Sequence, residues 1–96
     1  MERLRRQLVE ALEAHLRTSR PVAVPEAGRL LWRAFHELDA TRGYGQSGPQ
    51  PITSAEIEAW CRLTRTPLEP HHVGILRAMD AALVKHVVEE ARKAIM

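Results

Sequence analysis

The residues that could do chemistry in this chain do not form a catalytic or metal-binding pattern. His71 and His72 are adjacent, so on a helix their side chains point about 100° apart, and no Cys, His or carboxylate follows at ligand spacing. Serine, histidine and aspartate all occur, but none stands in the sequence context of a nucleophile elbow. The sequence therefore predicts no enzyme activity, no metal site and no cofactor.

Phosphate binding is not indicated either. The loop Gly43–Gly48 is rich in glycine, but it lacks the preceding strand and the Lys-Ser or Lys-Thr pair that a phosphate loop needs. Arginines gather near the N-terminus, yet Glu2, Glu10 and Glu13 are interleaved with them, and the net charge of the chain is only +2. This pattern is more typical of a solvated helix face than of a phosphate-binding patch.

Asp80 is the charged residue whose position most needs an explanation. It falls in the middle of an apolar helical stripe, where an unpaired carboxylate is costly to bury. It either accepts hydrogen bonds from a neighbouring helix start, a Trp indole or an Arg, or marks a place where the stripe reaches solvent. Because Asp80 has no second acid at helical spacing, we expect a structural buried carboxylate rather than a catalyst.

Two helix starts are the clearest local signals for the elements that position these residues. Thr53 and Glu56 have the spacing of a capping box, in which the side chain of each residue accepts a hydrogen bond from the backbone N–H of the other. Pro67 ends this helix near Thr66, because proline disfavours α geometry in the residue before it. Pro70 suits the first position of the next helix. We therefore predict a helical hairpin from Thr53 to the C-terminus.

The whole chain is predicted to be an all-α, four-helix single domain of residues 1–96. An N-terminal amphipathic helix lies in residues 1–19, a linker in 20–25 and a helical core in 26–96, whose first helix is expected from Glu26 to about Arg42. The long C-terminal helix carries an aliphatic stripe of Val73, Leu76, Leu83, Val84, Val87, Val88, Ala91 and Ile95. The N-terminal helix could cover the end of this stripe, from Val84 to Ile95, or mediate oligomerisation.

Composition places the chain among small cytoplasmic proteins. Its 96 residues are 45% hydrophobic and 27% charged, which supports one modest core. The single cysteine, Cys61, excludes an internal disulfide and is expected to be a reduced core residue. No apolar run approaches the roughly 18 residues of a membrane span, so no membrane association is expected. The sequence is compatible with a homo-oligomer as well as with a monomer.

A helix-turn-helix DNA-binding regulator is an alternative, because two helices flank a short turn between Thr53 and Leu83. A DNA reader needs exposed basic or amide side chains near the start of its second helix. This chain offers the run from Glu69 to Gly74, which contains no Arg, Lys, Asn or Gln. Nucleic acid is therefore not the expected partner, and a generic helical protein-interaction module is the other alternative.

Several segments together resemble the small tail-assembly chaperones, or tape-measure chaperones, of long-tailed phages and prophages. The resemblance covers roughly residues 27 to 86 and is spread over many short motifs. It rests on Leu31–Leu38, Gly48–Trp60, Leu63-Thr64, Leu68, Pro70, Ile75–Asp80 and Leu83.

The resemblance implies a non-enzymatic protein that binds the tape-measure protein during tail assembly, in the host cytoplasm if the chain is phage-encoded. An apolar groove between helices would receive an amphipathic helix of that partner. The side chains expected to line such a groove, or the core beneath it, are Trp32, Phe35, Trp60, Leu76, Met79 and Leu83.

Overall fold

The computed structural model describes residues 2–95, and most of them are helical. The predicted all-α class with four α-helices and a long C-terminal helix is confirmed for this part of the chain. The helices are accompanied by a 3-10 turn and by a hairpin of two very short antiparallel strands, in which Tyr44 pairs with Pro49. The elements are α1 Glu2–Thr18, η1 Glu26–Gly28, α2 Arg29–Asp39, β1 Tyr44–Gly45, β2 Gly48–Pro49, α3 Ser54–Thr64 and α4 Pro70–Ile95.

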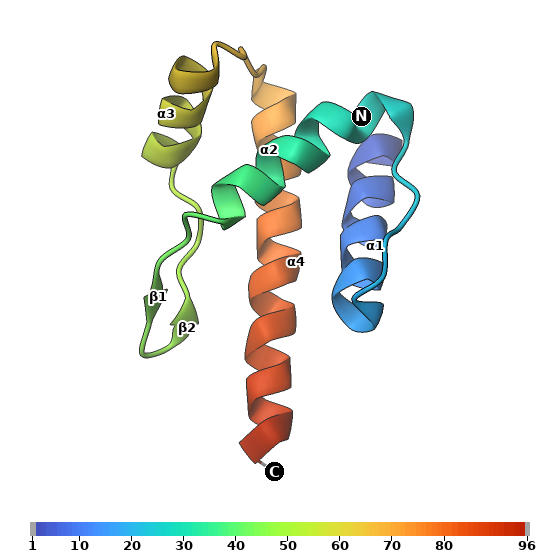
Figure 1. Ribbon diagram of the computed structural model, residues 1–96, viewed down its shortest axis with the longest axis vertical. Coiled ribbons are helices and arrows are strands. Elements are labelled where there is room, and N and C mark those ends of the chain that lie inside the picture. The colour runs from blue at the N-terminus through green and yellow to red at the C-terminus, as the bar shows by residue number, and fades with distance from the viewer. Residues whose placement is uncertain (1, 96) are drawn as a thin grey trace.

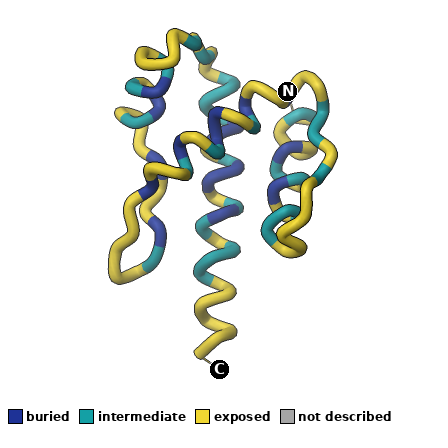
Figure 2. The backbone as a smooth tube through the Cα atoms, viewed as in Figure 1, coloured by how far each residue is buried: buried dark blue, intermediate teal, exposed yellow. Residues whose placement is uncertain are grey.

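Helix α4 is the axis of the molecule, and the other elements surround its first two-thirds. Its 26 residues span about 39 Å at 1.5 Å each, close to the 43 Å of the longest dimension. In Figure 1, α2 crosses α4, α1 lies on one side, and α3 with the β1–β2 hairpin lies on the other. Figure 2 shows that buried positions line the inner sides of these helices, while the last turns of α4 are exposed.

The core is built almost entirely from aliphatic side chains, with Phe35 and Trp60 as its aromatic members. Each of the four α-helices contributes side chains to it, so the helices share one core. The buried hydrophobic residues are Leu8, Leu12, Leu31, Ala34, Phe35, Leu38, Ile52, Ile57, Trp60, Ile75, Leu76, Met79 and Leu83.

The start of α3 is fixed by the predicted capping box. The Thr53 Oγ1 accepts a hydrogen bond from the Glu56 N–H at 3.1 Å, and the Glu56 carboxylate accepts one from the Thr53 N–H at 3.3 Å. The helix ends at Thr64, slightly before the predicted end, because Arg65 adopts a left-handed conformation with φ 55°. Its N–H bonds to the Cys61 carbonyl and closes the helix before Pro67 is reached.

The prediction of one helix from Glu26 to about Arg42 was wrong at both ends. The segment begins as the 3-10 turn η1, in which Ala27 is exposed. The buried Gly28 lies so close to α1 that an added Cβ would be 2.7 Å from Leu8 Cδ2. The far end stops at Asp39 because Arg42 turns back into the core, as described below.

The cover expected for the stripe from Val84 to Ile95 is incomplete. Helix α1 packs along α4, but its 17 residues span only about 26 Å, so it cannot follow the whole of α4. Val84, Val87 and Val88 are half-buried, whereas Ala91 is exposed and Ile95 is 87% exposed. The end of α4 therefore presents apolar side chains to solvent.

We predict that Thr53→Ala lowers the free energy of unfolding by about 1 kcal/mol, because the α3 N-terminus loses its side-chain acceptor. Thr53→Ser, which keeps the hydroxyl, is the matched control and should stay within about 0.5 kcal/mol of wild type. Urea unfolding followed by circular dichroism measures both. Equal stabilities of the Ala and Ser variants would contradict the cap.

Candidate functional site

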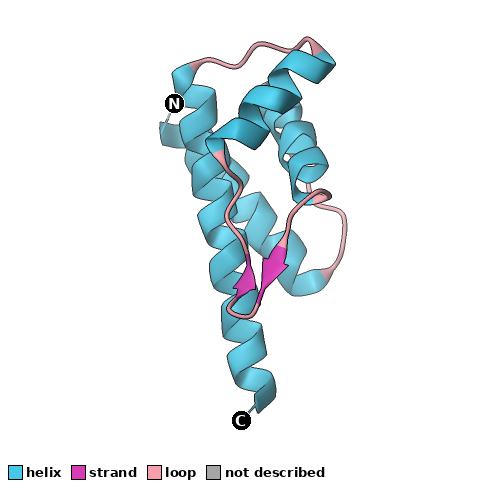
Figure 3. Cartoon of the chain, turned by 90° about the vertical axis from the view of Figure 1, so that its left-hand side faces the viewer, coloured by secondary structure: helices cyan, strands magenta, loops and turns pink. Residues whose placement is uncertain are grey.

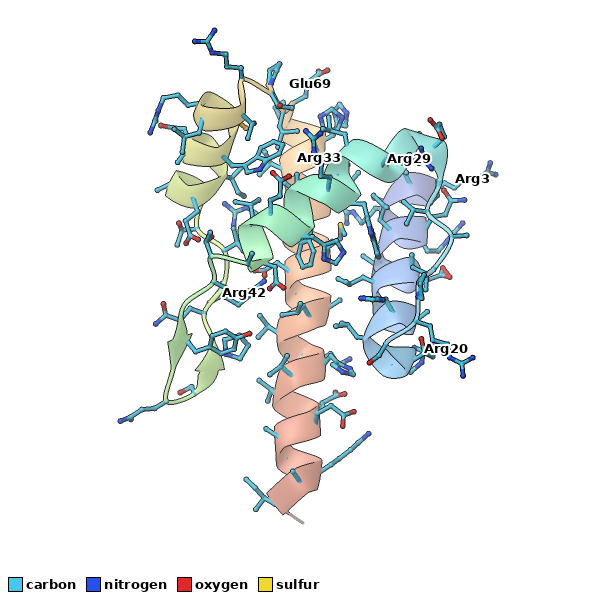
Figure 4. The ribbon with its side chains drawn as sticks, in the orientation of Figure 1. Arg3, Arg20, Arg29, Arg33, Arg42 and Glu69 are labelled. Atoms are coloured by element: carbon cyan, nitrogen blue, oxygen red, sulfur yellow. The ribbon has the colours of Figure 1, made fainter. Side chains whose placement is uncertain are left out.

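A buried ion pair joins α4 to the chain that leaves α2. Arg42 and Asp80 are 7% and 6% exposed, and Arg42 Nη2 lies 2.6 Å from Asp80 Oδ1. The second carboxylate oxygen of Asp80 accepts a hydrogen bond from the Ile52 N–H at 3.0 Å. Arg42 also donates through Nε to Asp39 and through Nη1 to the Gln50 carbonyl, each at 2.7 Å. Figure 4 shows Arg42 where the chain leaves α2 for the hairpin.

This cluster ties α4 to the segment between α2 and α3 through charges and hydrogen bonds. Burial by itself lowers the pKa of Arg42, but the hydrogen bonds and charges of Asp39 and Asp80 outweigh it and raise the pKa above its ordinary value. The guanidinium is therefore charged at every physiological pH and cannot act as an acid or a base. Asp80 thus accepts a hydrogen bond from the segment before α3 and forms an ion pair with an arginine.

The six side chains expected at a partner groove or in the core beneath it lie in or beside the core. Phe35, Leu76, Met79, Leu83 and Trp60 are buried. The sixth, Trp32 on α2, is partly buried and packs against the core cluster.

Trp60 is held by a specific polar contact as well as by packing. Its Nε1–H donates to Glu37 Oε1 at 2.7 Å, which ties α3 to α2. The ring of this indole is packed in the core, and its N–H group has a hydrogen-bond acceptor. The five buried members of the predicted set are each at most 7% exposed, so little of their surface is available to a partner.

A different set of apolar side chains remains accessible, on the side of α4 turned away from the core. Counting about 100° per residue, Ala81, Val84 and Ile95 point within about 40° of Val88. Core residues such as Met79 and Leu83 point about 140–180° away from Val88. We call Ala81, Val84, Val88 and Ile95 the outer face of α4.

Two grooves open onto the outer face, one on each side of the point where β2 approaches α4. The upper groove lies between the chain before α3 and α4, and it is lined by Pro51, Arg77, Asp80, Ala81, Val84 and Lys85. The lower groove lies between the hairpin and α4, and it is lined by Gln46, Ser47, Gly48, Pro49, Val87, Val88 and Ala91. Figure 3 shows the two strands alongside α4 at this level. Sequence reasoning missed Pro51 and Ala81 as lining residues; the spacing of Arg77, Ala81, Val84 and Val88 on one helix side was the available signal.

Trp32, the partly buried member of the predicted set, belongs to an aromatic cluster between α1 and α2. Its ring centroid is 4.8 Å from that of His36 and 6.4 Å from that of His15, in edge-to-face arrangements. Burial lowers the pKa of His36, the positive charge of a protonated His15 lowers it further, and Asp39 partly opposes them. Protonation of His36 is therefore disfavoured in the folded chain.

We predict that Asp80→Ala costs about 3–5 kcal/mol, because it leaves the Arg42 guanidinium buried without its counter-charge. The double variant Arg42→Met/Asp80→Leu should be less destabilised than Asp80→Ala, since no charge is stranded. Glu58→Ala, which removes an exposed carboxylate from α3, is the control and should change stability by less than about 0.5 kcal/mol. Urea unfolding decides: an Asp80→Ala variant as stable as Glu58→Ala would contradict the tether.

We further predict that stability falls as the pH drops below about 6.5, the ordinary pKa of histidine. Below that pH the unfolded chain takes up a proton on His36 more readily than the folded chain, so acid favours unfolding. His36→Gln should lose less stability than wild type between pH 7.5 and pH 5, measured by urea midpoints. The same pH dependence in His36→Gln and wild type would contradict this assignment.

The described part of the chain, residues 2–95, contains no helix long and apolar enough to cross a membrane. Within the same range, no three His, Cys, Asp or Glu side chains are grouped so that they could hold a metal ion. No curated protein and no solved structure matches the chain at a significant level. One family model, described as phage tail assembly chaperone, matches residues 9–85. This match spans α2, the hairpin, α3, the Arg42–Asp80 tether and most of α1, so the chain belongs to the phage tail assembly chaperone family.

Proposed function

We propose that this chain is a non-enzymatic chaperone that binds the tape-measure protein during tail assembly in the host cytoplasm. The observation that carries the proposal is the accessible outer face of α4, with an apolar groove at each of its two levels. A helical partner binds such a surface by laying its own apolar stripe into the groove. The outer face supplies small side chains spaced along one helix side, which is the form that a helix-in-groove contact needs.

The rigidity of the surroundings supports this role. The upper groove has Pro51 on one wall and α4 on the other, and the Asp80 bond to Ile52 N–H holds the two walls together. A groove whose walls are already fixed costs little conformational entropy when a partner binds. The partner would meet a preformed site rather than having to order a loop.

The start of α4 does not support the helix-turn-helix alternative. The rings of His71 and His72 lie against each other in a tilted arrangement with centroids 4.1 Å apart, and both residues are partly buried together with Val73. A recognition helix needs exposed hydrogen-bonding side chains in this place to reach base edges. Protein binding therefore accounts for the exposed apolar surface, and DNA binding does not.

Co-expression with a tape-measure fragment tests the proposal. Wild type should raise the soluble yield of the fragment and co-purify with it. Val84→Glu and Val88→Glu, which each place a charge on the outer face, should weaken the complex about tenfold or more, equivalent to about 1.4 kcal/mol. Leu63→Glu, on the 77% exposed Leu63 of α3, is the matched control and should leave binding unchanged.

Two results would contradict the proposal. A fragment that neither gains solubility from wild type nor co-purifies with it would remove the assigned partner. If Val84→Glu and Leu63→Glu bound the fragment equally well, the outer face of α4 would not be the binding surface. Circular dichroism of each purified variant tests whether unfolding causes a loss of binding. All three positions are exposed or half-buried, so we expect the variants to fold.

A further inference from the structure

The β1–β2 hairpin crosses the outer face of α4 and divides it. Strand β2 meets α4 at Val88, where a Cβ added to Gly48 would lie 3.8 Å from Val88 Cγ2. The upper groove, with Ala81 and Val84, lies on one side of this crossing, and Ala91 in the lower groove lies on the other. The outer face is therefore interrupted as long as the hairpin rests on α4 (Figure 3).

A partner helix needs the part of the face that the hairpin covers. From Ala81 to Ile95 the face extends about 21 Å at 1.5 Å per residue, which is about four turns of helix. The upper groove offers only two of its apolar side chains, Ala81 and Val84. Small side chains bury little area each, so several turns must be in contact to hold a partner. A helix that follows α4 beyond Val84 meets the hairpin at Val88.

The tip of the hairpin is held on α4 by few contacts. We call residues 44–48 the strap. Its first four residues are all exposed, and Tyr44 is 68% exposed. Gly48, the strap residue at the crossing, has no side chain to pack against Val88, and an open space of about 170 Å³ remains between the hairpin and α4. Little apolar area is therefore lost when the strap leaves α4.

The base of the hairpin, in contrast, is firmly fixed. The Gln50 N–H donates to the Gly43 carbonyl at 2.9 Å, and the Gln50 carbonyl accepts from Arg42 Nη1 at 2.7 Å. Pro49, next to this anchored pair, is buried. Beyond the base the hairpin is a ribbon of two residues per strand, and an isolated two-stranded ribbon is only marginally stable. The fold thus combines a fixed base with a loosely held strap.

We propose that the strap is displaced from Val88 when the partner helix binds, so that the two grooves join into one apolar face from Ala81 to Ile95. This inference rests on the proposed function and adds a conformational step to it. In the free chain the strap competes with the partner for Val88, and the apparent affinity is lowered by the fraction of chains in which the strap is open. The strap also covers part of an apolar surface while no partner is bound.

The distance between spin labels on the strap and on α4 tests the displacement. The variant Gln46→Cys/Glu89→Cys carries the labels, and Cys61→Ala removes the native thiol. Glu89 is exposed and points about 100° away from Val88, outside the outer face. Binding of the tape-measure fragment should lengthen the label distance by about 5–10 Å, because a helix about 10 Å across takes the place of the strap. Double electron–electron resonance measures it.

The matched control is Glu58→Cys/Glu89→Cys in the same Cys61→Ala background, with labels on α3 and α4. Its distance should stay the same when the fragment binds. An unchanged distance between labels at 46 and 89 in the bound state would overturn the inference. A change of similar size in the control would also overturn it, because α3 and α4 would then have moved apart as a whole.

A cross-link that holds the strap on α4 tests whether displacement is required. Ser47 and Ala91 line the same groove, so Ser47→Cys/Ala91→Cys, again with Cys61→Ala, can be joined by a short bismaleimide. The cross-linked protein should bind the fragment about tenfold or more weakly, because the open state is no longer populated. The same variant with each cysteine capped separately by N-ethylmaleimide is the control and should bind as the unmodified variant does. Equal binding by the cross-linked and capped proteins would overturn the inference.

The tape-measure fragment separates this inference from the proposed function. If wild type retains the fragment and Val84→Glu loses it, while the distance between labels at 46 and 89 does not change, this inference alone fails. If wild type does not retain the fragment, the proposed function fails on its own test, and the displacement of the strap by that partner fails with it.

Discussion

The arrangement of elements around α4 depends on the buried contact between Arg42 and Asp80. Desolvating two charges costs about as much as their attraction returns, so the pair contributes geometry more than net stability. That geometry is specific: one guanidinium holds Asp39, the Gln50 carbonyl and Asp80, while Asp80 also holds the Ile52 N–H. The end of α2, the segment that leads into α3, and the middle of α4 are thereby placed relative to one another in a single way.

The walls of the upper groove follow from this placement. Pro51 lies between Gln50 and Ile52, the two residues whose backbone groups are bound by the buried pair. It therefore cannot move away from Ala81 and Val84 without breaking these bonds. The Arg42–Asp80 pair is almost fully buried, with Asp80 at the floor of the upper groove, and it fixes the distance between the walls of that groove.

Sequence reasoning succeeded where the cause of a structure is local. The α3 start follows from Thr53 and Glu56, and the α4 start from Pro70, because caps and prolines act within one turn. It failed at α2, where both ends depend on distant contacts: Gly28 is pressed against Leu8, and Arg42 is drawn toward Asp80. The Gly/Pro-rich composition of residues 42–51 does not indicate that Arg42, at its start, is buried.

The same limit applies to the proposed binding surface on α4. Periodicity places apolar residues on α4 over an arc of about 200°, from Met79 round to Ala81. One layer of neighbours cannot cover so wide an arc, but the sequence does not say which part stays open. Large residues such as Leu76 and Leu83 are buried in the core, whereas the smaller Ala81, Val84 and Val88 are exposed or half-buried. Small side chains bury little area each, at about 25 cal/mol per Å², so binding here is a sum of weak contacts. Such a surface suits a chaperone, which must hold its partner and later release it.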